Sequence, residues 1–140
     1  MTPEQIALVQ QSFAKVAPIA DRAAIIFYER LFQLAPQIKA MFPSDMTEQR
    51  RKLMAALTVV VNGLSNPDTL LPAASALARR HVAYGARAEH YPIVGAALLW
   101  TLEQGLGEAW TAEIADAWTV AYGTLSTFMI EQAYGRAHPG

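Results

Sequence analysis

Residues 79–95 read RRHVAYGARAEHYPIVG and contain two of the three histidines of the 140-residue chain. His81 continues a series with Leu70, Ala74 and Leu77, whose spacing puts all four on one face of a helix. The pattern therefore predicts that His81 points into the core with the leucines. It leaves two interpretations open: a core histidine bonded to a backbone carbonyl, or a ligand to a metal or haem iron.

The other two histidines lie in different settings. His90 precedes Tyr91 and Pro92 at the end of a connector that starts near Ala86, and His138 belongs to the C-terminal tail. Neither lies on an apolar helical face, so His81 is the candidate ligand.

Composition excludes several classes of function. Hydrophobic residues make up 53% of the chain and charged residues only 16%, so the chain has much to bury. A net charge of -1 offers no basic surface for nucleic acid, and the lack of cysteine excludes disulfides, thiolate nucleophiles and iron–sulfur clusters. The N-terminus has no signal-like run and no apolar run is long enough for membrane insertion. We therefore expect a cytoplasmic, soluble protein.

Proline and glycine separate blocks of helical periodicity, and no segment alternates as a strand would. The break at Ser65-Asn66-Pro67-Asp68 is the clearest of these boundaries. Seven helices of uneven length, one of them very short, are not typical of a four-helix bundle. They are predicted to begin near Pro3, Asp21, Pro36, Glu48, Leu70, Pro92 and Thr111. The helices that begin at Leu70, Pro92 and Thr111 are predicted to end near Tyr84, Gly107 and Tyr134, respectively.

Two polar residues on inward faces are further candidates for chemistry. Tyr28 is either a core tyrosine or a hydroxyl donor in a pocket, and Gln49 is either an exposed amide or part of the same pocket. Arg50, Arg51 and Lys52 form either a solvated face or counter-charges for an anionic ligand. No phosphate-binding glycine loop, metalloprotease motif or nucleophile elbow is present in the sequence.

Four stretches resemble the single-domain bacterial haemoglobins and the globin domain of flavohaemoglobins. They are residues 27–42, which begin FYERLF; residues 49–53, QRRKL; the opening stretch 79–95, with its HYPIVG run; and residues 117–123, AWTVAYG. The resemblance covers nearly the whole chain and implies an all-α globin fold of about seven to eight helices around a haem pocket. Residues 1–140 would form one globin domain without a reductase domain.

The resemblance implies a set of site residues around haem b (iron protoporphyrin IX). His81 would be the proximal ligand to the iron, and Tyr28 and Gln49 match the distal pair that hydrogen-bonds bound oxygen. His90 is not the ligand in this family. The other haem contacts that the resemblance implies are Phe42, Lys52, Leu53, Leu57, Tyr91 and Val94.

Four of these contacts have distinct roles in the family. Phe42 would stack on the haem, Leu53 would pack over the iron, and Lys52 would meet a propionate. Tyr91 would pack near the proximal imidazole. A dry distal pocket strengthens the hydrogen bonds of Tyr28 and Gln49, because water does not compete for them.

One position departs from the flavohaemoglobin pattern. A glutamate in their last helix pairs with the proximal tyrosine, whereas alignment on Trp118 and Tyr122 puts Ala133 there. Glu131, two residues away, turns to another side of the helix. We therefore expect a backbone carbonyl to hold the His81 ring, as in ordinary oxygen carriers.

The resemblance implies reversible binding of dioxygen at ferrous iron. It also implies a second reaction, oxidation of nitric oxide to nitrate, in which Tyr28, Gln49 and Tyr91 would act and a separate reductase would re-reduce the iron. Trp110 and other apolar surface residues are compatible with a monomer or a weak homodimer. The alternative function is a gas-sensing or haem-free regulatory module of globin fold.

Overall fold

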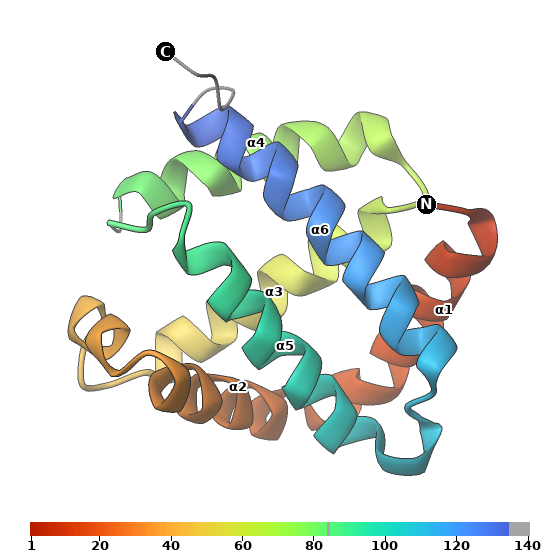
Figure 1. The fold of residues 1–140 in the computed structure, drawn as a ribbon, viewed down its shortest axis with the longest axis horizontal. Helices are drawn as coiled ribbons and strands as arrows, with labels where there is room; N and C mark the ends of the chain where they lie inside the picture. The colour runs from red at the N-terminus through yellow and green to blue at the C-terminus, as the bar shows by residue number, and fades with distance from the viewer. Residues whose placement is uncertain (84, 135–140) are drawn as a thin grey trace.

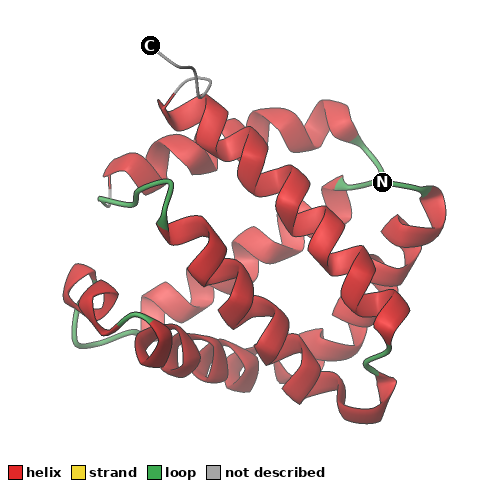
Figure 2. Ribbon diagram, viewed as in Figure 1, coloured by secondary structure: helices red, strands yellow, loops and turns green. Residues whose placement is uncertain are grey.

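The computed structural model describes residues 1–83 and 85–134, and in this part of the chain all regular structure is helical (Figure 2). His138 therefore lies outside the described residues. The α-helices are α1 (Pro3–Val16), α2 (Ala20–Leu34), α3 (Thr47–Gly63), α4 (Pro67–Ala83), α5 (His90–Leu106) and α6 (Ala112–Tyr134). Three short 3₁₀ helices lie between them: η1 (Ala17–Ile19), η2 (Pro36–Met41) and η3 (Gly107–Ala109).

The helix ends follow local sequence signals. Thr2 and Gln5 form a reciprocal capping box at the start of α1, where Pro3 occupies the first helical position. Asp45 accepts the backbone N–H of Thr47 at the start of α3, and this hydrogen bond is the largest cause that lowers the Asp45 pKa. These contacts satisfy N–H groups that have no acceptor within the helix.

The structure corrects the predicted helix count and two boundaries. Within the described residues there are six α-helices rather than seven to eight, because the predicted helix at Pro36 is a 3₁₀ turn. Helix α4 begins at Pro67 instead of Leu70, and α5 begins at His90 instead of Pro92. Prolines within the first turn are tolerated because the N–H they lack has no intrahelical acceptor there. Pro72 also lies inside α4 without ending it.

Packing produces two hydrophobic clusters. Helices α5 and α6 cross the molecule, with α2 packed on α5 and α4 packed on α6 (Figure 1). The larger cluster joins α1, α2, α3, α5 and α6, and includes a buried hydrogen bond of 2.8 Å from Trp118 Nε1 to Ser12 Oγ. The smaller one consists of Ala74, Ala78, Tyr91 and Met129, with Leu77 and Ala133 among the residues packed on it.

The surface of the molecule differs from expectation at one residue. Trp110 is half-buried against the larger cluster, so it is not the exposed contact residue that the sequence suggested. No helix in the described segments has both the length and the apolar character needed to span a bilayer.

Candidate functional site

The end of α4 positions His81. Gly85 has a φ of 89°, its N–H donates to the carbonyl of Val82, and the N–H of Ala86 donates to the carbonyl of His81 at 3.0 Å. This pair of bonds is a Schellman cap, in which glycine takes the left-handed conformation without steric cost. His81 is thus held in the last turn of the helix, on the face predicted from the sequence.

The His81 ring has a defined orientation. It is half-buried, and Nδ1 lies 2.8 Å from the carbonyl oxygen of Leu77, one turn earlier. Because a carbonyl oxygen can only accept, this contact favours the tautomer with the proton on Nδ1 and the lone pair on Nε2. This is the backbone contact expected from the sequence, and it leaves the ring chemically suited to ligate iron through Nε2.

Tyr91 lies beside this imidazole. The ring centroids of His81 and Tyr91 are 6.3 Å apart, and Tyr91 is only 6% exposed. Its hydroxyl oxygen is buried and has no hydrogen-bond partner among the described residues. Ala133 packs on the cluster that contains Tyr91, whereas Glu131 is exposed. Burial raises the pKa of Tyr91, so its hydroxyl is neutral at physiological pH.

Helix α6 also holds the first turn of α5 in place. The Tyr122 hydroxyl donates to the carbonyl of Tyr91 at 2.5 Å, and burial raises the Tyr122 pKa above its ordinary range. A Cβ at Gly95 would come within 2.5 Å of the Tyr122 ring, so only glycine allows this close approach. The glycine and tyrosine of the two quoted motifs therefore contact each other across the α5–α6 interface.

Tyr28 and Gln49 are brought together from α2 and α3. Gln49 Nε2 donates to the Tyr28 hydroxyl oxygen at 3.1 Å. Burial raises the pKa of Tyr28, and the hydrogen bond from Gln49 opposes that shift to a smaller extent. The hydroxyl is therefore neutral, and no hydrogen bond among the described residues uses its proton. Its ring packs edge-on against Phe27 and Phe42, with centroids 4.9 and 5.6 Å away.

The remaining predicted contacts are apolar, with one exception. Four of them are half-buried and pack on the larger cluster: Phe42, Leu53, Leu57 and Val94. Lys52 is exposed, near Glu48 on the surface of α3. Half-buried apolar side chains, an imidazole that can ligate iron and a buried hydroxyl donor are groups that suit a haem site. The residues present therefore fit a haem.

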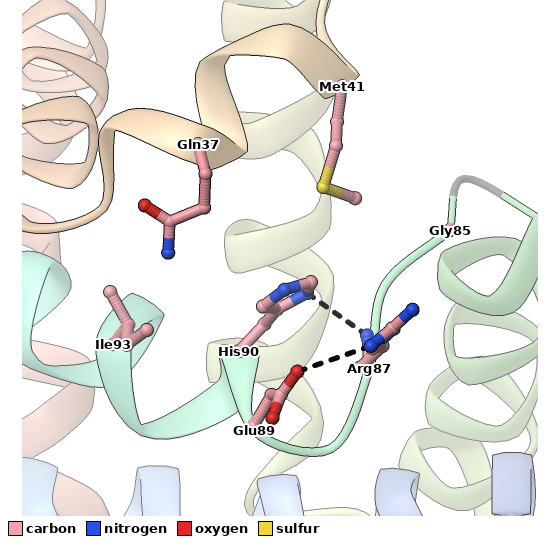
Figure 3. A pocket seen from close by; sticks show the side chains of 7 residues that line it. All are labelled: Gln37, Met41, Gly85, Arg87, Glu89, His90 and Ile93. Carbon is pink, nitrogen blue, oxygen red and sulfur yellow. Dashed lines mark hydrogen bonds and ion pairs between the residues drawn. The ribbon is translucent and has the colours of Figure 1, made fainter.

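A cleft of about 560 Å³ lies between η2, the connector after α4, and the first turns of α5 (Figure 3). It is lined by Gln37, Met41, Gly85, Arg87, Glu89, His90 and Ile93. His90 Nδ1 accepts the backbone N–H of Arg87 at 3.0 Å, so this histidine stabilises the connector. The sequence contained no signal for the cleft, because its walls come from three separate segments.

Comparison with known proteins identifies the family. A family model described as Globin matches residues 25–129. The chain belongs to the globin family. It is 35% identical over 133 residues to a flavohemoprotein of Bordetella parapertussis, covering 93% of this globin and 33% of that protein. A flavohemoprotein of Rhizobium meliloti is 37% identical over 106 residues, which cover 74% and 26% of the two chains. This globin thus matches between a quarter and a third of the length of these relatives.

Solved structures agree with the assignment. A bacterial globin from Campylobacter jejuni is 28% identical, with a TM-score of 0.83 over 94% of this globin and 96% of that chain. A hexacoordinated heme protein from a tardigrade has a TM-score of 0.87 over 95% of each chain. At 16% identity, the second shows only that the fold is shared. Membership of the globin family implies a haem cofactor.

Proposed function

We propose that this globin holds haem b with His81 as the iron ligand and binds dioxygen reversibly. The observation that carries the proposal is the Tyr28–Gln49 hydrogen bond, which joins a buried phenol and an amide in one donor pair. A core tyrosine without a function would bury a hydroxyl at a cost in desolvation. The resemblance to bacterial haemoglobins supports the same assignment.

When bound, the haem supplies a ferrous iron that combines reversibly with dioxygen. The protein residues orient the proposed iron ligand, supply a hydrogen-bond donor and exclude water. Leu77 holds the proton of His81 on Nδ1, so that Nε2 can ligate the metal. Gln49 holds the Tyr28 oxygen, so that the phenol proton is directed to a polar ligand in the pocket. Leu53 and Phe42 exclude water, which strengthens that hydrogen bond.

We further propose oxidation of nitric oxide to nitrate as a second activity, with a separate reductase that returns the iron to the ferrous state. The similarity of this globin to proteins called flavohemoproteins supports this second activity. The carbonyl of Leu77 is an uncharged partner for His81 Nδ1, and such a partner favours carrier-like over peroxidase-like chemistry.

Absorption spectra of the purified protein test the proposal in its ferric, ferrous, oxygen-bound and carbon monoxide-bound forms. His81→Ala should lose most of its haem, because the only proposed metal ligand is removed. His90→Ala is the matched control and should keep haem, since its Nδ1 is bonded to Arg87 in the connector.

Two results would contradict the proposal. A His81→Ala protein with a normal five-coordinate ferrous spectrum would show that another residue ligates the iron. Wild-type protein without haem absorption, even after haem is added, would favour the alternative of a haem-free regulatory module.

A further inference from the structure

Two tyrosines of α6 hold the connector between α4 and α5 at its two ends. The Tyr134 hydroxyl donates to the carbonyl of Ala86, where the connector begins. The Tyr122 hydroxyl donates to the carbonyl of Tyr91, where α5 has just begun. Both bonds join a side chain of the last helix to main-chain oxygens that lie more than thirty residues earlier.

The Tyr134 contact continues directly to His81. The peptide group of Ala86 donates through its N–H to the carbonyl of His81 at 3.0 Å, and the carbonyl of the same residue accepts from Tyr134. Ala86 therefore links the side chain of Tyr134 to the main chain of His81. Displacement of α6 at this point would be transmitted to the cap that ends α4.

Tyr134 follows Ala133, the residue at the place of the flavohaemoglobin glutamate. The end of α6 thus offers a hydroxyl to the main chain of the connector, whereas the glutamate of the flavohaemoglobins would pair with the proximal tyrosine. Both arrangements couple the last helix to the proximal side.

We propose that Tyr134 is a positioning residue, which holds His81 in place through Ala86. This inference takes from the proposed function one assumption, which is that His81 ligates the iron. The hydrogen bond itself can be tested in protein without haem.

Tyr134→Phe removes the hydroxyl and keeps the ring, and because the side chain is 44% exposed the core is not disturbed. Amide hydrogen exchange of Ala86, measured by NMR in the haem-free protein, should become roughly two- to tenfold faster, the range for one net hydrogen bond. Gln132→Ala is the matched control. It removes the acceptor of the Ser75 hydroxyl, a contact of 3.1 Å between α4 and α6, and should leave Ala86 exchange unchanged.

The second readout is the iron–histidine stretch in the resonance Raman spectrum of the ferrous haem protein. It should shift in Tyr134→Phe and not in Gln132→Ala. Unchanged Ala86 exchange would overturn the proposal, because the bond would not stabilise the connector. Faster exchange with an unchanged stretch would also overturn it, because the bond would then not position His81.

A third measurement separates this proposal from the proposed function. If the wild-type protein takes up no haem, the proposed function fails, and the ¹⁵N shifts of the His81 imidazole in the haem-free protein decide the inference. If the His81 ¹⁵N shifts change in Tyr134→Phe but not in Gln132→Ala, the result would support positioning of His81. Identical ¹⁵N shifts in the wild type and both variants would refute it.

Discussion

Replacement of Tyr28 by phenylalanine should accelerate the dissociation of dioxygen. The substitution removes one oxygen atom from a side chain that is 6% exposed and keeps the ring contacts with Phe27 and Phe42. It also removes the acceptor of the Gln49 amide. The pocket would thus lose its phenol donor while its shape is retained.

The magnitude follows from the kind of hydrogen bond that is lost. Bound dioxygen carries partial negative charge, and a hydrogen bond to a charged acceptor contributes about 1–3 kcal/mol. This corresponds to a roughly 5- to 150-fold faster dissociation. Gln49→Leu should have a smaller effect, because the Gln49 amide is bonded to the Tyr28 oxygen at 3.1 Å and helps to orient it. The two substitutions should therefore be non-additive in a double-mutant cycle.

Stopped-flow displacement of dioxygen by carbon monoxide measures the rate. Phe32→Leu is the matched control, since the Phe32 ring packs 6.0 Å from that of Tyr28 but forms no hydrogen bond with it. Its effect should be smaller than that of Tyr28→Phe. Unchanged dissociation in both Tyr28→Phe and Gln49→Leu would refute the assigned role of the pair.

The protonation of the Tyr28 phenol determines how the dissociation of dioxygen should depend on pH. Burial raises the pKa of Tyr28, so the neutral phenol persists through the ordinary titration range of tyrosine. Dissociation should therefore be constant from neutral pH to about pH 9. The stability contributed by burying the neutral hydroxyl is present below the unfolded-state pKa and is lost as the pH rises through the folded-state value.

Two further substitutions test the proximal side. Ala133→Glu would add a carboxylate to the Tyr91 cluster and should raise the iron–histidine stretch in the ferrous resonance Raman spectrum; no shift would place residue 133 away from the imidazole. Gly95→Ala should lower the free energy of unfolding by about 1–3 kcal/mol in denaturant titrations, because its Cβ would clash with Tyr122. Gly123→Ala is the control, because a Cβ added there would meet no atom of another segment within 4 Å, and equal unfolding midpoints for the two variants would contradict the close approach at Gly95.

Much of the candidate site could be predicted because its residues lie on regular helices. The Leu70, Ala74, Leu77 series placed His81 on the inward face of α4, and Ala74 is 1% exposed in the structure. The boundaries of α4 and α5 were less predictable. The sequence pattern predicts a break at Pro67 and a helix start at Pro92, whereas both prolines lie within the first turns of their helices.

The sequence by itself determined the all-helical architecture, the inward position of His81 and the absence of a glutamate at position 133. These properties depend on residue type and on a period of 3.6, both of which are local. Only the tertiary structure decided that Gln49 bonds to Tyr28 and that the Tyr91 hydroxyl lacks a protein partner within the described residues. It also decided that Tyr134 reaches Ala86. Such contacts join segments 21 to 48 residues apart, and they depend on how the helices pack, which no local pattern encodes.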